Sequence, residues 1–264
     1  MSRRFAGRRA LVSGASRGIG AAVVDKLAAH GADVVAIART WERHDHLDGN
    51  LKEVVESARR HGTVVEAVMA DLSSPEDRAG LVARAAEALG GDIDILVNNA
   101  AAAMYQPLLD YPAKRSHLTF EVNVHAPLDL AQQAAGAMIA NGEGWIVNVS
   151  SATANLRPGP PFDIPPPGTA MSVYGASKAA LNRITNGLGA ELYGTGVRVN
   201  TVEPRFGVLT EGANQLVGDK FDASVFESMD EMVDGLLLLC DCDPDLTGGV
   251  RISLDLLEER GLRG

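Results

Sequence analysis

The stretch that decides the fold is RALVSGASRGIG, residues 9–20. It begins with a short apolar run typical of a buried strand, and a segment with helical spacing of apolar residues follows. Glycine lets the backbone turn sharply and approach a phosphate, and the start of a helix offers unpaired N–H groups to an anion. Strand, glycine-rich loop and helix in this order favour a dinucleotide site over a tight loop without a ligand. The residues predicted to bind the dinucleotide here are Gly14, Ser16, Arg17, Gly18, Ile19 and Gly20.

Strand-like and helix-like segments alternate along the rest of the chain. Runs this apolar, separated by helices, imply a parallel sheet covered on both faces, with right-handed crossovers. The predicted fold class is therefore α/β: a Rossmann-like doubly wound, mostly seven-stranded parallel sheet in three layers (αβα), within a single domain over residues 1–264. Strands are expected at residues 9–13, 33–38, 64–70, 93–98, 145–150, 197–202 and 250–254, and helices at 18–30, 51–61, 75–89, 113–140 and 173–192.

The composition excludes several classes of function. A formal net charge of −10 argues against general binding to nucleic acid or to an anionic membrane, because both require positive fields. The longest apolar stretches are far shorter than the ~20 residues that span a bilayer. Cys240 and Cys242 are too close for an ordinary disulfide and are interpreted as structural thiols on a late helix. We therefore expect a soluble, cytoplasmic protein.

Two segments interrupt the alternation of strands and helices. Residues 41–50 contain His44, Asp45 and His46, but no further ligand is in view, so a solvated loop is favoured over a metal site. Residues 157–168 hold six of the twelve prolines and predict an irregular or polyproline II loop. This loop is either an exposed recognition segment or, as its position favours, part of a substrate site.

The end of the second expected strand indicates which nicotinamide dinucleotide would bind. An acidic residue there would hold a ribose 2′-hydroxyl, but the sequence has Ala38, Arg39 and Thr40. Arg39, with Arg17 of the glycine loop, would suit a 2′-phosphate, since guanidinium groups form paired hydrogen bonds with phosphate. The alternative is that either arginine faces solvent. The pattern favours NADP(H) over NAD(H), with Arg17, Arg39 and Thr40 as contacts.

Further motifs occur in order along the chain. They are Asp71-Leu72 after the third expected strand, Asn98-Asn99-Ala100 after the fourth, Asn123, Ser150-Ser151 after the fifth, Tyr174-Gly175-Ala176-Ser177-Lys178, and Asn200 with Pro204. In type, order and approximate spacing, from residue 5 to about 254, the chain resembles the short-chain dehydrogenase/reductase (SDR) family, with its TGxxxGIG, NNAG and YxASK patterns. Ser13 stands in place of the Thr, and Ala101 in place of the last Gly of NNAG.

The resemblance implies a role for each of these residues. Tyr174 would give a proton to the substrate oxygen, or take one from it, and Ser151 would hydrogen-bond that oxygen. Lys178 would bind the nicotinamide ribose, and Asn123 would help to anchor a water-linked proton relay. The remaining contacts of the dinucleotide would be Asp71, Leu72, Asn99, Ala100, Tyr174 and Pro204.

The pairing of Tyr174 with Lys178 can also be argued from its chemistry. Residues four apart share one face of a helix. A free phenol has a pKa near ~10, too high for acid–base work at neutral pH, and a nearby ammonium would lower it. Tyr–Lys pairs at this spacing are common on surface helices, so the catalytic interpretation of this pair depends on the other motifs.

Departures from the family pattern concern the substrate. Residues 157–168 look like an insertion between Ser151 and Tyr174, and the C-terminal Asp-Gly-Gly is missing. Arg205 stands where the family usually has Gly, which suggests either a cation that contacts the substrate or a solvated, ion-paired side chain. A substrate-loop region is expected at about 205–230. The predicted substrate contacts are Tyr105, Phe162, Arg205 and Phe206, with Ile164 as a further apolar wall.

The sequence therefore predicts an oxidoreductase that transfers a hydride between NADP(H) and the carbonyl or secondary alcohol of a moderately hydrophobic small molecule. The family commonly forms tetramers or dimers, so a homotetramer or homodimer is expected. One alternative is a catalytically silent dinucleotide-binding sensor or scaffold, but its expected damage to the catalytic set is not seen. Another is reduction of an activated C=C bond, which Ser151 and the Tyr174–Lys178 pair disfavour.

Overall fold

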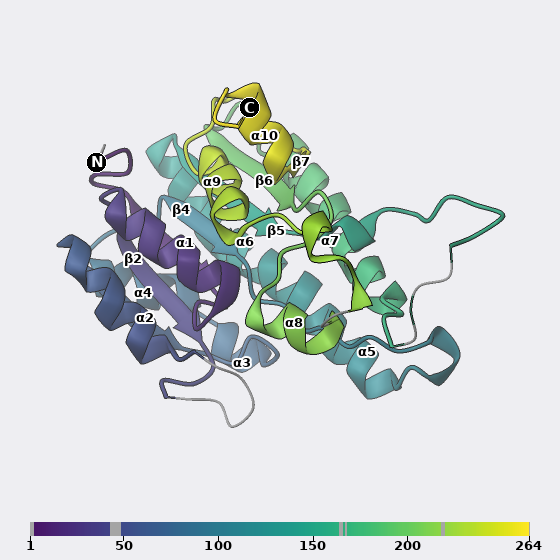
Figure 1. Cartoon of the computed structure of the whole chain (residues 1–264). Coiled ribbons are helices and arrows are strands. Elements are labelled where there is room, and N and C mark those ends of the chain that lie inside the picture. Colours follow the sequence, from purple (N-terminus) through teal and green to yellow (C-terminus); the bar gives the residue numbers. More distant parts are fainter. Residues whose placement is uncertain (1–2, 43–48, 164–165, 167, 218–219, 264) are drawn as a thin grey trace.

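A single parallel sheet organises the computed structural model (Figure 1). The strands are β1 (Arg9–Ser13), β2 (Asp33–Ala38), β3 (Val65–Met69), β4 (Ile95–Asn98), β5 (Gly144–Val149), β6 (Val197–Glu203) and β7 (Val250–Ile252). Their order is β3-β2-β1-β4-β5-β6-β7, and every neighbouring pair is parallel. The predicted fold class is confirmed. The described residues are 3–42, 49–163, 166, 168–217 and 220–263.

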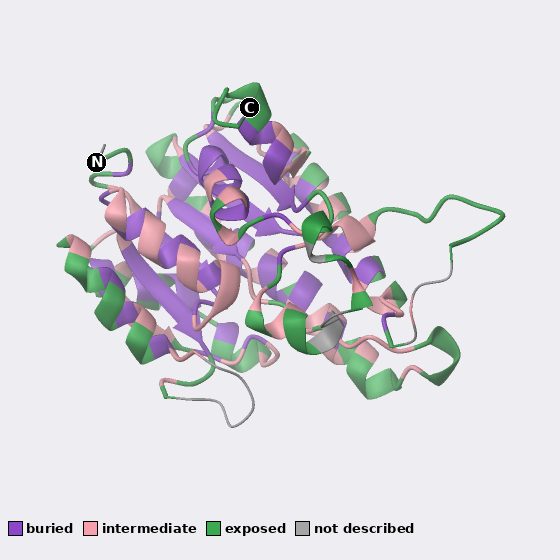
Figure 2. Ribbon diagram, viewed as in Figure 1, coloured by how far each residue is buried: buried purple, intermediate pink, exposed green. Residues whose placement is uncertain are grey.

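Helices enclose this sheet on both sides; its five central strands are buried between them, and the edge strands β3 and β7 are partly exposed (Figure 2). The helices are α1 (Gly18–Ala29), α2 (Leu51–Ala58), α3 (Pro75–Arg78), α4 (Leu81–Leu89), α5 (Ala113–Phe120), α6 (Ala126–Asn141), α7 (Ser172–Glu191), α8 (Glu211–Val217), α9 (Met229–Leu239) and α10 (Ser253–Glu259). In the part of the chain that the structure describes, no helix is both long enough and apolar enough to cross a membrane.

The side chains of β1 show how the two faces are filled. Ala10 and Val12 belong to one hydrophobic cluster and Leu11 to another, because successive residues of a strand point to opposite faces. The first cluster takes its helical residues from α1, α2, α9 and α10, and the second from α4, α6 and, at its edge, α7. The apolar strands predicted from the sequence are thus covered on both faces.

Several predicted elements differ from the observed ones. The helix expected over 75–89 is divided into α3 and α4, since Gly80 between them adopts a φ of +65°. The helix expected over 113–140 is interrupted by a π-helical turn at Glu121–His125. The helix expected over 51–61 ends as a 3₁₀ turn, Arg59–His61. The last predicted strand stops at Ile252, where α10 begins.

The order of the strands positions the functional site. The chain leaves β1 toward one edge of the sheet through β2 and β3, and then returns to place β4 on the other side of β1. In open parallel sheets, ligands bind beyond the carboxyl ends of the strands at such a switch point. The glycine loop follows β1 and the Asn99 segment follows β4, so both lie at this point.

Candidate active site

A cleft of about 1570 Å³ lies along the loops that follow β1, β2, β4, β5 and β6, and the first turns of α7 also line it. Nearly all of the predicted cofactor, catalytic and substrate residues line this cleft. The exceptions are Gly20 and Asn123, which lie just behind its wall, and Arg205, which lies elsewhere. Ile164 lies outside the described residues.

The glycine loop fits closely against the end of β4. Gly14 has a φ of +66°, and a Cβ there would lie 2.7 Å from the Cα of Ala100. The Asn99 side chain donates to the carbonyl oxygens of Ser13 (3.0 Å) and Gly14 (3.1 Å). At Gly20, a Cβ would collide with the Gly14 carbonyl. Only glycine therefore permits this tight loop, whose shape fits a phosphate held at the start of α1.

Two arginines approach each other where the adenosine end of a dinucleotide would lie. Arg17 immediately precedes α1, and its buried Nη1 has no hydrogen-bond partner among the described residues. Burial lowers the pKa of Arg17, and the charge of Arg39 lowers it further, while Glu211 acts in the opposite direction. Two cations that repel each other, one with an unpaired buried N–H, form an arrangement that an anion would relieve.

Asp71 lies beside Arg39 at the same end of the cleft. Burial alone would raise the pKa of Asp71, but hydrogen bonds from the backbone and hydroxyl of Ser73, together with the charge of Arg39, lower it. The Asp71 Oδ1 atom accepts both Ser73 hydrogen bonds, at 2.9 Å from N and 2.8 Å from Oγ. This carboxylate is therefore ionised and fixed in place at neutral pH.

Tyr174 and Lys178 project from one face of α7 toward the end of β5. The Lys178 Nζ atom donates to the carbonyl oxygen of Val149 (2.7 Å) and lies 5.7 Å from the centre of the Tyr174 ring. The lysine is only 2% exposed, and this burial lowers its pKa from 10.5 to about 8. The ammonium thus lies in a buried position, with one hydrogen-bond acceptor among the described residues.

The protonation of Tyr174 differs from the sequence-based expectation. Burial, with the nearby Tyr105, raises the pKa of the Tyr174 phenol above its usual value, and a hydrogen bond with Ser151 only partly offsets this. The expectation of a lowered pKa was wrong, because desolvation of the phenolate outweighs the stabilisation that the Lys178 ammonium offers. The phenol therefore keeps its proton at neutral pH and can donate it.

Ser151 is held in place by a neighbour that sequence reasoning missed. Its Oγ accepts from the backbone N–H of Thr153 (3.2 Å) and shares a hydrogen bond with Thr153 Oγ1 (2.9 Å). Thr153 lies in the short 3₁₀ turn Ala152–Ala154 that follows β5, and Ser151 is the N-cap of this turn. A second hydroxyl two residues after the serine is the signal that could have indicated this turn.

Asn123 lies behind the cleft rather than in it. It belongs to the π-helical turn between α5 and α6 and is fully buried. Its Oδ1 accepts from Ala102 N (2.7 Å), and its Nδ2 donates to Ala102 O (3.0 Å) and Ser177 Oγ (3.0 Å). The Ser177 hydroxyl in turn donates to the Tyr174 carbonyl oxygen (2.6 Å). The Asn123 side chain thus ties the β4 loop to the helix that carries Tyr174.

Arg205 does not line the cleft, which contradicts the predicted substrate contact. Its Nη2 atom donates to Asp255 Oδ1 (2.5 Å) and to both carboxylate oxygens of Glu258 (3.0 Å each). The physical reason is that two carboxylates of α10 lie within reach of the guanidinium. The ion-paired alternative therefore describes this residue.

Glu203, at the end of β6, is a buried acid that sequence reasoning overlooked. It is 3% exposed; burial raises its pKa, partly offset by hydrogen bonds with Asn155 and Asn182. The Asn155 Nδ2 atom donates to Glu203 Oε1 (3.1 Å), which joins the loop after β5 to the end of β6. The single acidic residue of β6, directly before Pro204, was the available signal.

The described start of the proline-rich loop, residues 157–163, borders the cleft and also extends away from the body of the molecule (Figure 1). Arg157, Pro158 and Phe162 contribute to the cleft wall, and the Arg157 Nη1 atom donates to the Asp163 carbonyl oxygen (3.2 Å). Phe162 is 59% exposed, so its ring has apolar surface left to cover.

Potential metal ligands are not clustered in the described residues. Among them, no group of three or more His, Cys, Asp or Glu side chains could hold a metal ion, and His44, Asp45 and His46 lie outside the described part. Cys240 and Cys242 are buried free thiols, and burial raises the pKa of each.

The fold and this cleft together define an oxidoreductase with a nicotinamide dinucleotide cofactor. Residues 8–220 match the short chain dehydrogenase family. The chain therefore belongs to the short-chain dehydrogenase/reductase family and is an enzyme acting on CH–OH and C=O groups.

Its relatives include named reductases of similar length. The chain is 34% identical to L-xylulose reductase of Bos taurus, over 97% of this chain and 98% of that one. It is 32% identical to carbonyl reductase [NADPH] 2 of Sus scrofa, with the same coverage. Among solved structures, a 3-oxoacyl (acyl-carrier-protein) reductase from Agrobacterium tumefaciens with NADP bound superposes with a TM-score of 0.77 at 27% identity, covering 95% of this chain and 94% of that one.

Proposed function

We propose that this enzyme transfers a hydride between NADP(H) and the carbonyl or secondary alcohol of a moderately hydrophobic small molecule. The observation that carries the proposal is the convergence of Tyr174, Ser151 and Lys178 in one cleft with the glycine loop. Burial favours the protonated phenol of Tyr174, and Ser151 lies within its reach, so the two hydroxyls can meet one substrate oxygen.

The protein's own contribution to the reaction is orientation and proton transfer. When bound, the nicotinamide supplies the hydride to the carbonyl carbon. Tyr174 donates its phenolic proton to the carbonyl oxygen as the C=O bond becomes CH–OH, and Ser151 Oγ hydrogen-bonds the same oxygen. The Lys178 ammonium lies close enough to stabilise the resulting phenolate. Asn123 acts indirectly, by fixing the start of α7 through Ser177.

The choice of NADP(H) rests on Arg17 and Arg39. Both line the cleft, neither is neutralised by an acid at the end of β2, and one Arg17 N–H is buried without a partner among the described residues. A 2′-phosphate between these guanidinium groups would accept hydrogen bonds and remove their repulsion. The name of the carbonyl reductase relative, which specifies NADPH, supports the same preference.

Replacing both arginines by alanine is expected to abolish this preference. The Arg17→Ala/Arg39→Ala variant should raise the Kd for NADPH about 100-fold, because each charge-assisted hydrogen bond contributes about 1.5–3 kcal/mol. The Kd for NADH should change less than about 3-fold. Fluorescence titration with both nucleotides measures this, with Arg183→Ala, an exposed arginine outside the cleft, as control. Equal losses for NADPH and NADH would contradict the proposal.

The function itself is tested by following the oxidation of NADPH and of NADH with a panel of ketones, aldehydes and diketones. We expect turnover with NADPH and a lower kcat/KM with NADH. Saturable binding of NADPH without turnover of any carbonyl compound would contradict the proposal.

We also propose that the chain forms a homodimer or homotetramer. Val250, on the edge strand β7, is exposed in the single chain, and an unpaired edge of this kind is commonly covered. Light scattering coupled to size exclusion should give the mass of two or four chains, and a monomer would contradict this.

A further inference from the structure

Three phenylalanines from the segment after β6 form a cluster in the cleft wall. The ring centres of Phe206 and Phe226 are 5.5 Å apart, those of Phe206 and Phe221 5.7 Å, and those of Phe221 and Phe226 6.5 Å. Each pair meets nearly edge to face, the arrangement that aromatic rings prefer. All three rings line the same cleft as Tyr174.

The cluster is not closed off from the cleft. Phe206 is 46% exposed, and Phe221 and Phe226 are half-buried. Apolar surface left open in a concave site is a mark of ligand binding rather than of core packing. The rings meet one another and still have surface that a ligand could cover.

The backbone brings the two ends of this segment together. Val208 and Glu227 form an isolated parallel bridge, and the Glu227 N–H donates to the Gly207 carbonyl oxygen (3.0 Å). A Cβ at position 207 would lie 3.1 Å from the Phe226 ring, so the absence of a side chain there lets this ring pack closely. Phe206 and Phe226 are thus fixed at a short distance although they are far apart in sequence.

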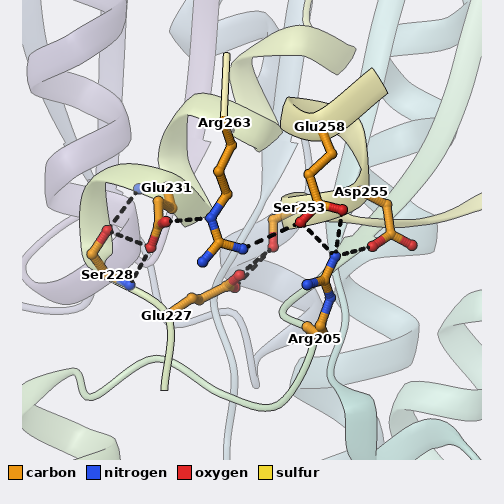
Figure 3. Close-up of polar contacts among 8 residues, drawn as sticks. All are labelled: Arg205, Glu227, Ser228, Glu231, Ser253, Asp255, Glu258 and Arg263. Atoms are coloured by element: carbon orange, nitrogen blue, oxygen red, sulfur yellow. Dashed lines mark hydrogen bonds and ion pairs between the residues drawn. The ribbon is translucent and has the colours of Figure 1, made fainter. Parts of the chain in front are cut away.

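The residues that flank this pair are anchored to the same helix (Figure 3). Arg205, directly before Phe206, donates to Asp255 and Glu258 of α10. Glu227, directly after Phe226, accepts from the Ser253 hydroxyl with both carboxylate oxygens (2.8 Å each). α10 therefore holds both ends of the aromatic cluster.

We call the contacts of Arg205 and Glu227 with α10 the anchor, and neighbouring ion pairs add to it. Arg263 pairs with Glu231 (2.9 Å) and Glu258 (3.4 Å), and Glu231 forms a capping box with Ser228 at the start of α9 (Figure 3). Burial raises the pKa of Glu227 to about 7, even though its hydrogen bond from Ser253 opposes this rise. Burial of a carboxyl group is costly unless the group is hydrogen-bonded, so the bond from Ser253 stabilises Glu227 in this position.

We propose that Phe206, Phe221 and Phe226 form an apolar subsite that takes the non-reacting end of the substrate, an aromatic ring or a branched alkyl group. Arg205 and Glu227 are positioning residues, which hold this subsite against α10 and do not touch the substrate. The inference rests on the proposed function, since it needs a carbonyl compound in the same cleft. It narrows the substrate class to carbonyl compounds with a bulky apolar substituent.

Two diketones that differ by one ring test the subsite. Both 1-phenylpropane-1,2-dione and butane-2,3-dione present a dicarbonyl group, and we compare their kcat/KM values with NADPH. In the wild type, kcat/KM should be higher for the phenyl compound than for butane-2,3-dione. The ratio of the two kcat/KM values should fall about 10-fold in Phe206→Ala and Phe226→Ala, since lost apolar contact weakens discrimination by this order. If an alanine variant fails to fold, Phe226→Leu replaces it in the same comparison. Val225→Ala, an exposed neighbour outside the cleft, should keep the ratio.

The anchor is tested separately through Glu227. Glu227→Ala should raise the KM for the phenyl compound about 5- to 10-fold, while kcat and the KM for NADPH stay within about 2-fold. Glu227→Gln should retain the wild-type KM, because its amide oxygen can still accept from Ser253. Ser253→Ala removes the same hydrogen bonds from the other side and should resemble Glu227→Ala.

The outcomes separate this inference from the proposed function. Reduction of both diketones with a ratio that the phenylalanine variants leave unchanged overturns the subsite and leaves the function standing. A KM for 1-phenylpropane-1,2-dione that is unchanged in Glu227→Ala overturns the anchor. Calorimetric binding of 1-phenylpropane-1,2-dione to the protein with NADP⁺ needs no turnover: weaker binding in Phe226→Ala supports the subsite even if the reductase function fails, and unchanged binding overturns it.

Discussion

Replacing Tyr174 by phenylalanine is expected to lower kcat/KM for every carbonyl substrate by at least about 1000-fold, near the upper range for loss of a general acid. The change removes one hydroxyl and keeps the ring that packs beside Tyr105, 6.0 Å away. The Kd for NADPH should stay within about 3-fold, because the glycine loop and the two arginines remain. Steady-state kinetics and nucleotide titration measure the two effects.

Tyr193→Phe is the matched control. Tyr193 lies just beyond the end of α7, is exposed and does not line the cleft. This variant should keep wild-type activity. If Tyr174→Phe retained more than about a tenth of the wild-type kcat/KM, Tyr174 would not be the proton donor.

Lys178→Met is expected to lower kcat/KM about 100- to 1000-fold without loss of stability. Methionine keeps an unbranched apolar stem but carries no charge to stabilise a phenolate. Because the two residues act as a unit, Tyr174→Phe/Lys178→Met should be no less active than Tyr174→Phe alone. Kinetics of the two single variants and the double variant check this, and multiplied losses would contradict the coupling.

The stability part of this prediction follows from the pKa of Lys178. Folding lowers it from 10.5 to about 8, so below pH 8 the buried charge costs about 3 kcal/mol. The unfolded chain binds the proton more tightly, so this cost is relieved as pH rises from 8 to 10.5. Methionine avoids it but loses the hydrogen bond to Val149, worth about 1 kcal/mol.

The difference in unfolding free energy between wild type and Lys178→Met isolates this one group. The variant should be at least as stable at pH 7, and the wild type should gain on it between pH 8 and pH 10. Denaturant unfolding at three pH values measures the difference. A variant that is several kcal/mol less stable at pH 7 would show that the lysine is mainly structural.

The parallel sheet could be predicted from the sequence because its strands carry the signal locally. Residues 9–13 and 33–38 are apolar runs between turns, and β1 and β2 have these bounds. Elements whose form depends on distant contacts were less predictable. The π-helical turn that holds Asn123 is one example, since Ala102 and Ser177 stabilise it from other parts of the chain.

The site shows the same division between local and distant effects. The glycine loop and the Tyr174–Lys178 spacing are visible in single short motifs, and the structure brings them to one cleft. Arg205 was misassigned because its partners Asp255 and Glu258 lie about 50 residues further along the chain. The protonation of Tyr174 could not be predicted either, since desolvation depends on everything packed around the phenol.

The central claim is that the enzyme moves a hydride from NADPH to a carbonyl carbon. The most direct measurement uses NADPH deuterated at C4 on each face in turn, with 1-phenylpropane-1,2-dione as substrate and mass spectrometry of the alcohol formed. The account predicts that one labelled face, and not the other, delivers one deuterium to the new CH–OH carbon. An alcohol without deuterium from either face, or no alcohol despite saturated NADPH binding, would contradict it.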